Sequence, residues 1–204
     1  MGPSGSGKST LLKTLAGLIP ATVWDADCKA QDWTGSGSMV GQEPFLFEDS
    51  LRNNLLYGHP AEESLSEDEI QKSLEKSCVL QEVAALPGGT DHQVQAVQRN
   101  LSGGQIQRLV IARALLRPAN VWYFDEATSS VDADAENRLL KNLLESCRSG
   151  GKTLLAVTHR LGSVPDFDEV WFLEQGRLVA AGTHAELTEL PRYREFYGAT
   201  ETHL

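Results

Sequence analysis

The chain opens on Met1-Gly2-Pro3-Ser4-Gly5-Ser6-Gly7-Lys8-Ser9-Thr10, the stretch that decides its fold. It matches the phosphate-binding loop pattern G-x-x-x-x-G-K-[ST] without a mismatch. Glycines let successive backbone N–H groups turn inward into a concave anion site that a Cβ would obstruct. The Leu-rich run at residues 11–18 predicts a helix whose positive N-terminal end faces the same anion. The pattern therefore predicts a nucleotide site in which Lys8 contacts the β- and γ-phosphates and Ser9 ligates Mg²⁺.

Composition limits the class of protein. The 204 residues are 41% hydrophobic and 23% charged, which is typical of a soluble globular chain of one domain. The net charge of −10 argues against general nucleic-acid binding, which needs a basic face. Cys28, Cys78 and Cys147 lie far apart without a C-x-x-C pair, so free thiols are expected rather than disulfides or zinc. No apolar run reaches about 18 residues, so no membrane span is expected.

Strand and helix signals alternate along the chain, which predicts an α/β sheet with ligands at the carboxyl ends of its strands. Apolar runs at 121–124 and 153–157 predict strands buried on both faces, residues 38–40 look like the end of another strand, and 170–173 with 177–180 predict a hairpin. Residues 21–38 give a poor signal, and we interpret them as a loop with one short strand. The helix after the phosphate loop should stop at Pro20. The side chains expected to cap later helices are those of Ser50, Ser66, Ser102, Asp132 and Thr183.

Several short motifs follow the phosphate loop in order. They are Gln42, Leu101-Ser102-Gly103-Gly104-Gln105, Asp125-Glu126 after an apolar run, Ser129-Ser130-Val131-Asp132, and His159. Taken singly, each has an ordinary explanation. A glycine-containing pentapeptide can begin a helix, an acidic pair can cap a turn, and a lone histidine is more often structural than catalytic. Only the order of all these motifs along one chain indicates a particular function.

This order resembles the ATP-binding-cassette (ABC) ATPases, and the resemblance covers nearly the whole chain. It implies an α/β P-loop NTPase (RecA-like) fold, with a mostly parallel sheet flanked by helices. Residues 1–204 would form one ABC ATPase domain without its N-terminal strands, and about 48–116 would form a helical signature subdomain. The implied activity is hydrolysis of ATP to ADP and phosphate with Mg²⁺.

The resemblance also implies a role for each motif. Glu126 would polarise the attacking water, His159 would contact the γ-phosphate, and Gln42 would contact Mg²⁺ and relay the nucleotide state to a transport domain. The metal ligands would be Ser9, Gln42 and Asp125. The nucleotide-binding residues would be Gly2, Ser4, Gly5, Gly7, Lys8, Ser9, Thr10, Ser102, Gly104, Gln105 and Asp132.

Two partners are implied in the same way. ABC ATPase domains dimerise head to tail, so Ser102 and Gly104 would act on ATP held by the partner chain. Residues 42–47, 50–54 and 57–58 resemble the exporter type, in which the ATPase is fused behind a transmembrane domain. We therefore expect a location at the cytoplasmic face of a membrane and no nucleic-acid partner.

Two other hypotheses stay open at this point. The chain could be a non-hydrolysing remnant that acts as a dimerising module. It could also be a soluble cassette ATPase of DNA repair or translation, although residues 45–58 and the acidic charge count against that reading. The transported substrate is chosen by the membrane domain in this family, so this chain does not specify it.

The first prediction concerns the start of this sequence, where only Met1 precedes Gly2 although the loop usually follows a buried strand. Without that strand, about five apolar side chains' worth of packing is lost, on the order of 10 kcal/mol. That loss is comparable to the stability of a whole domain, about 5–15 kcal/mol. We expect residues 1–204 alone to fold poorly and bind ATP weakly, as measured by urea unfolding and ATP titration. A cooperative transition together with micromolar ATP affinity would contradict this.

Overall fold

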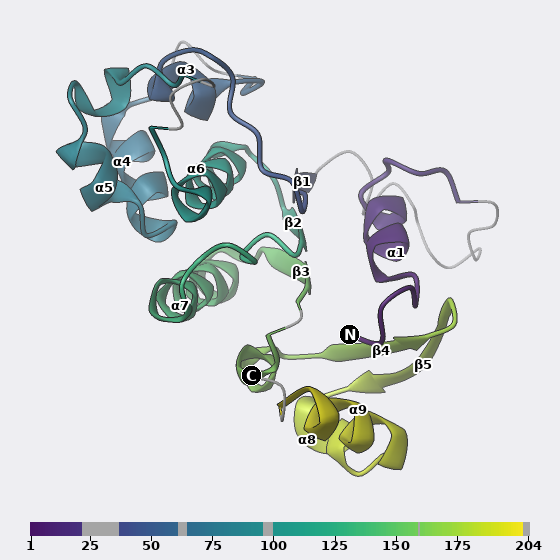
Figure 1. Cartoon of the computed structure of the whole chain (residues 1–204). Coiled ribbons are helices and arrows are strands. Elements are labelled where there is room, and N and C mark those ends of the chain that lie inside the picture. Colours follow the sequence, from purple (N-terminus) through teal and green to yellow (C-terminus); the bar gives the residue numbers. More distant parts are fainter. Residues whose placement is uncertain (22–36, 61–64, 96–99, 159, 202–204) are drawn as a thin grey trace. The chain divides into compact units, whose positions relative to one another are not determined.

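The chain divides into two units, Met1–Gly35 with Ala156–Leu204, and Ser36–Leu155 (Figure 1). The computed structural model describes residues 1–21, 37–60, 65–95, 100–158 and 160–201. Residues 22–36, which cover most of the stretch that gives a poor sequence signal, lie outside this description. The elements in chain order are α1 (Lys8–Leu15), β1 (Gly37–Val40), α3 (Leu51–Leu56), α4 (Glu67–Lys76), α5 (Leu80–Ala85), η2 (Gly89–Asp91), α6 (Gly103–Leu116), β2 (Val121–Asp125), α7 (Ala133–Gly150), β3 (Thr153–Val157), η3 (Leu161–Asp166), β4 (Val170–Glu174), β5 (Arg177–Gly182), α8 (His184–Thr188) and α9 (Pro191–Glu201).

A small sheet of three described strands has β2 at its centre. β1 pairs with β2, with Met39 opposite Tyr123 and Val40 opposite Phe124, and β3 follows in the order β1-β2-β3. Every residue of β2 is buried, which confirms the strand predicted from its apolar run. β3 has the expected range, but only Val157 is buried, so the prediction of a strand buried on both faces is wrong there. Within the described sheet β3 has one neighbouring strand, which leaves its side chains partly exposed.

Helices gather around α6 in the unit Ser36–Leu155 (Figure 1). α3, α4 and β1 all contact α6, which explains why that helix is buried on more than the one face expected from its periodicity. Arg108 on α6 forms an ion pair with Glu82 of α5 at 2.7 Å. The apolar cluster that holds these helices together consists of Leu51, Leu55, Leu56, Ile70, Leu74, Val79, Val83, Leu101, Leu109 and Ala112.

Helix starts agree with the sequence because they depend on neighbouring residues. Ser66, Ser102 and Thr183 each accept a hydrogen bond from the third residue of their helix, whose side chain bonds back to the cap. Ser50 and Asp132 cap α3 and α7 with their side chains alone.

The end of α1 differs from its prediction. The helix begins at Lys8 and ends at Leu15, well before Pro20. Gly17 takes a φ of 75°, and the N–H of Leu18 bonds to the carbonyl of Lys13 at 2.9 Å. This glycine-centred turn satisfies the last carbonyls of the helix and therefore ends it before proline can.

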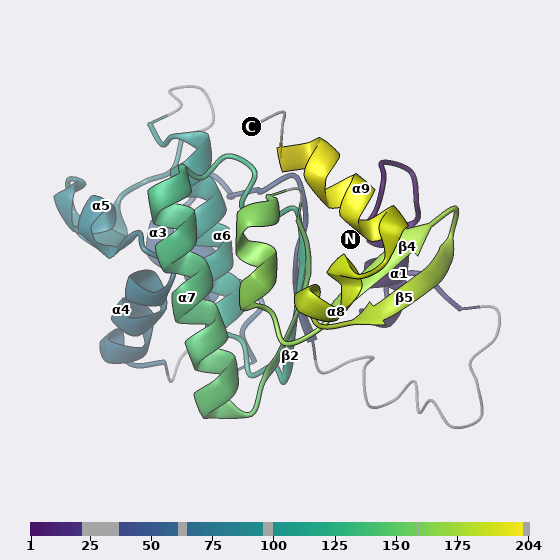
Figure 2. The same ribbon diagram turned by 90° about the horizontal axis from the view of Figure 1, so that it is seen from below.

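The C-terminal part of the unit Met1–Gly35 with Ala156–Leu204 is built on an antiparallel hairpin of β4 and β5, as predicted. α8 and α9 cover one face of this hairpin (Figures 1 and 2). Phe172 packs edge-on against Tyr193, with ring centroids 5.5 Å apart. The buried cluster of this unit consists of Leu161, Val164, Val170, Phe172, Leu187 and Tyr193.

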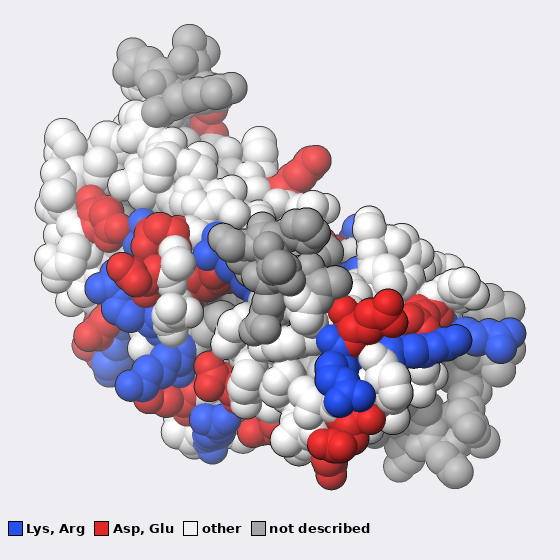
Figure 3. Space-filling view, turned by 60° about the horizontal axis from the view of Figure 1, so that its bottom comes forward, with Lys and Arg blue, Asp and Glu red and all other residues white. Residues whose placement is uncertain are grey.

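Cys78 and Cys147 are free thiols, and Cys28 lies outside the described residues. Of the helices that the structure describes, none has the length and apolarity needed to cross a bilayer. On the face shown in Figure 3, Lys and Arg lie in small groups among Asp and Glu.

Candidate functional site

The phosphate loop has a backbone that glycine adopts readily. Gly2, Gly5 and Gly7 have φ values of 141°, 75° and 93°. α1 begins directly after Gly7, and no side chain caps its first turn. The N–H groups of that turn can therefore donate to an anion, as they do at many helix N-termini that bind phosphate.

The side chain of Lys8 lies within this loop. Its Nζ donates to the carbonyl oxygen of Gly2 at 2.8 Å and to that of Pro3 at 2.7 Å, and the residue is buried. An ammonium that donates to neutral carbonyls can exchange them for phosphate oxygens, which bind it more strongly. The glycine backbone, the uncapped helix start and Lys8 together fit a phosphate group.

The loop is anchored to the β4–β5 hairpin by backbone contacts. The N–H of Leu173 donates to the carbonyl oxygen of Met1 at 2.8 Å, and the N–H of Gly176 donates to the carbonyl oxygen of Ser6 at 3.1 Å. A Cβ at Gly2 would lie 1.9 Å from the carbonyl oxygen of Leu173, so only glycine fits there. Sequence reasoning missed this anchor, because no local pattern links the loop to a hairpin so far along the chain.

Gln42 and Glu126 meet in the unit Ser36–Leu155. Gln42 follows β1 and Glu126 follows β2, and Gln42 Nε2 donates to Glu126 Oε2 at 2.9 Å. Because the strands are parallel, their carboxyl ends lie at the same edge of the sheet. Asp125, the last residue of β2, is buried with 3% exposure. Glu126 has a φ of 53°, an unusual backbone for a non-glycine residue and one found more often at functional sites.

The Leu-Ser-Gly-Gly-Gln motif forms the start of α6. Ser102 Oγ accepts from Gln105 N at 3.2 Å, and Gln105 Oε1 accepts from Ser102 N at 2.8 Å. A Cβ at Gly104 would lie 2.8 Å from the carbonyl oxygen of Ser130, so this glycine allows the motif and residues 129–132 to touch. Ser102 is exposed, and the start of α6 is therefore open to solvent.

Gln107 is a further candidate site residue, which sequence reasoning did not find. It is 1% exposed, donates from Nε2 to Ser129 Oγ at 2.9 Å, and accepts at Oε1 from Ser130 N at 2.8 Å. At the other end of this segment, Asp132 Oδ1 accepts from Ala135 N at 2.9 Å, and this bond lowers the pKa of Asp132. Residues 129–132 are thus held at both ends. The signal that could have indicated Gln107 is a glutamine at a buried position of a helix.

The sequence-predicted residues are distributed over both units. The phosphate loop belongs to the first unit, and Gln42, Asp125, Glu126, the motif at residues 101–105 and Asp132 belong to the second. His159 lies outside the described residues. Among the residues described, no group of three or more His, Cys, Asp or Glu is placed to hold a metal. The hydroxyl of Ser9 and the carboxylate of Asp125 are oxygen donors of the kind Mg²⁺ takes, with substrate phosphates supplying further ligands.

Comparison with known proteins identifies the family. Residues 1–129 match the ABC transporter family. The chain is 36% identical over 195 residues to the glutathione/L-cysteine transport system ATP-binding/permease protein CydD of Escherichia coli, covering 92% of this chain and 32% of that protein. It is 39% identical over 191 residues to the mycobactin import ATP-binding/permease protein IrtB of Mycolicibacterium smegmatis, covering 90% of this chain and 32% of that protein.

A solved structure shows the same similarity in three dimensions. A bacterial Atm1-family ABC exporter with ATP bound superposes with a TM-score of 0.80 at 29% identity, covering 99% of this chain and 35% of that one. The chain thus spans about a third of the length of each of these three proteins. Its α/β fold, its phosphate loop and these matches together show that the chain belongs to the ABC transporter family.

Proposed function

We propose that this chain binds ATP and hydrolyses it to power export across a membrane, as the nucleotide-binding domain of an ABC transporter. The observation that carries the proposal is the contact of Gln42 with Glu126 at the carboxyl end of a parallel strand pair. This edge is where open α/β sheets bind their ligands. A carboxylate held there by an amide is suited to orient a water molecule.

ATP binding is assigned to the phosphate loop. Lys8 exchanges the carbonyls of Gly2 and Pro3 for phosphate oxygens, and the first turn of α1 donates its N–H groups. Ser4, Gly5 and Gly7 form the rest of the loop around the phosphates. Mg²⁺, with Ser9, Gln42 and Asp125 as its proposed ligands, would neutralise charge that develops on the phosphates.

Hydrolysis is assigned to Glu126. Phosphoryl transfer needs an in-line water and compensation of charge rather than covalent chemistry by the protein. The bond from Gln42 orients the carboxylate of Glu126, which would accept a hydrogen bond from the attacking water. Contact of His159 with the γ-phosphate stays a prediction.

A head-to-tail dimer would complete the site. The exposed start of α6 presents Ser102 and Gly104, and the α6 dipole favours an anion there. Gln105 supports this end through its bond to Ser102 N. Asp132 lies in the segment that contacts the motif, so both would face the partner's nucleotide.

The proposed transmembrane partner would dock near residues 45–57. Phe45 is 62% exposed and Tyr57 57% exposed, and exposed aromatic side chains that lie together favour protein contacts. Phe47 packs on Tyr57 with centroids 4.2 Å apart, and Arg113 donates to the carbonyl of Phe45 at 3.1 Å. This surface consists of residues just before the proposed helical subdomain, at about residues 48–116, and of residues within it. Docking there would place the chain at the cytoplasmic face of a membrane.

Glu126→Gln tests the proposed chemistry. In the full-length transporter we expect ATP turnover to fall at least about a hundredfold, because the attacking water loses its carboxylate acceptor. ATP binding should stay within about twofold, since Lys8 and the loop are unchanged. Phosphate release and nucleotide binding are measured on the same preparation. Turnover within about threefold of wild type, less than about 1 kcal/mol of barrier, would exclude Glu126 from this role.

Ser102→Arg tests action on the partner's nucleotide. We expect the variant to lose turnover without weaker ATP binding to the monomer, because the serine serves the opposite site. Mixing it with Lys8→Ala chains should restore activity, since each mixed dimer keeps one site free of both substitutions. Equal loss of monomer binding and turnover in Ser102→Arg would argue against a site shared between chains.

Gln107→Leu tests whether residues 129–132 must be held against α6. The substitution removes both bonds to Ser129 and Ser130, which together are worth about 1–3 kcal/mol. We expect turnover to fall about tenfold with unchanged ATP affinity, because the segment facing the partner loses its position.

A matched control separates this role from stability. Gln71→Leu makes the same change at an exposed position of α4 and should leave turnover unchanged. If Gln107→Leu and Gln71→Leu behave alike, or if loss of turnover in Gln107→Leu follows only the loss of folded protein in thermal unfolding, Gln107 has no positioning role.

A further inference from the structure

A histidine and an asparagine are bonded to each other just before the start of α6. His92 follows η2, and Asn100 directly precedes the motif at residues 101–105. Asn100 Nδ2 lies 2.8 Å from His92 Nε2, and it also donates to the carbonyl oxygen of Gln93 at 3.0 Å. The chain that leads into the motif is therefore tied back to the end of η2.

The carbonyl oxygens around this pair determine where its protons lie. The carbonyl of Pro87 lies 3.2 Å from His92 Nδ1 and can only accept, so Nδ1 carries a proton. The carbonyl of Gln93 can also only accept, so the amide nitrogen of Asn100, rather than its oxygen, faces Gln93 and His92. Both protons of this amide are then donated, and His92 Nε2 has to accept one of them. The bonds are complete only while His92 is neutral.

A second proton on the ring of His92 is incompatible with this arrangement. It turns Nε2 into a donor that faces the donor of Asn100. Turning the amide over gives Nε2 an oxygen to bond, but the same oxygen then lies against the carbonyl of Gln93. One of the two bonds of Asn100 is lost in either case. Histidine side chains in general change charge between about pH 5 and 8, so this loss falls in an accessible pH range.

Charged side chains near His92 bond to other groups. Those on η2, on α5 and on the segment that runs into α3 are Glu48, Asp49, Arg52, Glu82 and Asp91. Arg52 lies 3.8 Å from Asp91, and Glu82 pairs with Arg108 at 2.7 Å. Within the described part of the chain, none of these five side chains is hydrogen-bonded to His92. The ring bonds to Pro87 and Asn100 are therefore the contacts that respond to its proton.

We propose that His92 is a positioning residue for the Ser102 motif and makes ATP turnover fall at acid pH. The inference rests on the proposed function, in which Ser102 and Gly104 act on the partner's nucleotide. Leu101, between Asn100 and Ser102, is buried in the apolar cluster around α6, so a shift of Asn100 is passed on to the start of the helix. Neutral His92 holds this start in place at higher pH, and the hold is lost as pH falls.

Turnover at saturating ATP tests the proposal in the full-length transporter. His92→Gln keeps an oxygen that can accept from Asn100 but cannot gain a proton. The ratio of its turnover to that of the wild type should rise about fivefold between about pH 7.5 and 5.5, the effect of one hydrogen bond. A side chain that only stabilises the fold would give a ratio that does not rise as pH falls.

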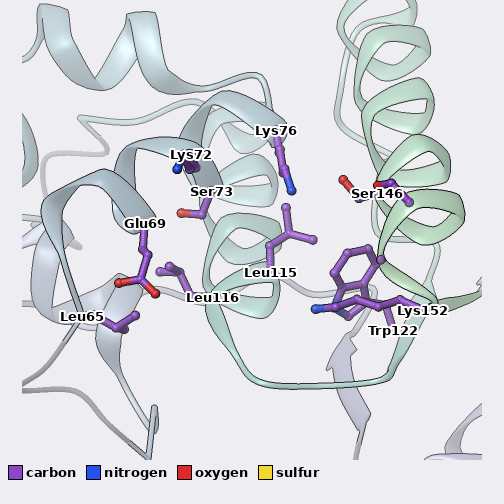
Figure 4. Close-up of a pocket in the computed structure, with 12 residues that line it drawn as sticks. Leu65, Glu69, Lys72, Ser73, Lys76, Leu115, Leu116, Trp122, Ser146 and Lys152 are labelled. Atoms are coloured by element: carbon purple, nitrogen blue, oxygen red, sulfur yellow. The ribbon is translucent and has the colours of Figure 1, made fainter.

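His59 provides a matched control at the other end of α6. Its Nε2 donates to the carbonyl oxygen of Leu116 at 3.1 Å, and Leu116 lines the groove between α4, α6 and α7 that Figure 4 shows. A bond that histidine donates survives a second proton, and glutamine can donate it as well. His59→Gln should therefore keep a constant turnover ratio over the same pH range.

Hydrogen–deuterium exchange tests the bond itself without ATP hydrolysis. The peptide at residues 100–106 is compared between wild type and His92→Gln at each pH, so that its intrinsic exchange rate is the same in both. We expect equal exchange at about pH 7.5 and about threefold faster exchange of the wild type at about pH 5.5. This measurement separates a failure of the inference from a failure of the proposed function.

Three results would overturn the proposal. The first is a turnover ratio of His92→Gln that stays constant with pH. The second is an equal rise of the ratio in His59→Gln. The third is equal exchange of residues 100–106 in wild type and His92→Gln at about pH 5.5.

Discussion

The parallel pairing of β1 with β2 is the constraint on which the candidate site depends. Pairing in this register places Val40 opposite Phe124, so residues that follow the two strands come to one edge although they are far apart in sequence. Because β2 is buried along its whole length, a slip by one residue would reverse which side chains of β1 face each side of the sheet, at a large cost in packing. The contact of Gln42 with Glu126 is a consequence of this register. The packing of α6 against β1 adds to the same constraint.

The backbone is strained just after the end of β2. Glu126 has a left-handed backbone, which costs on the order of 1–3 kcal/mol for such a residue. The turn after it is closed by the N–H of Ser129, which donates to the carbonyl of Glu126 at 3.2 Å. The buried Thr128 donates to Glu136 of α7, which ties the same turn to a second helix. The core around β2 thus holds a conformation that Glu126 would rarely adopt in a free peptide.

Local features were predictable from sequence, and features that depend on distant neighbours were not. The capping boxes at Ser66, Ser102 and Thr183 were found because their partners lie three residues away. The burial of α6 and β3 was misjudged, because it depends on which elements pack beside them rather than on periodicity. Within the site, the pattern G-x-x-x-x-G-K-[ST] indicated the phosphate loop, and the order of motifs indicated the acidic pair. The bonds of Gln107 to residues 129–130 and the anchor of Gly2 on β4 join segments with no shared pattern, so only the structure reveals them.

A chain with a net charge of −10 has to bind an anion through local groups. In the phosphate loop, two carbonyl oxygens already balance the ammonium of Lys8, and a ligand must replace them. Such an exchange favours a ligand with several negative oxygens, because each lost carbonyl bond has to be made good. The proposed phosphate site therefore does not need the broad basic face that nucleic-acid binding requires.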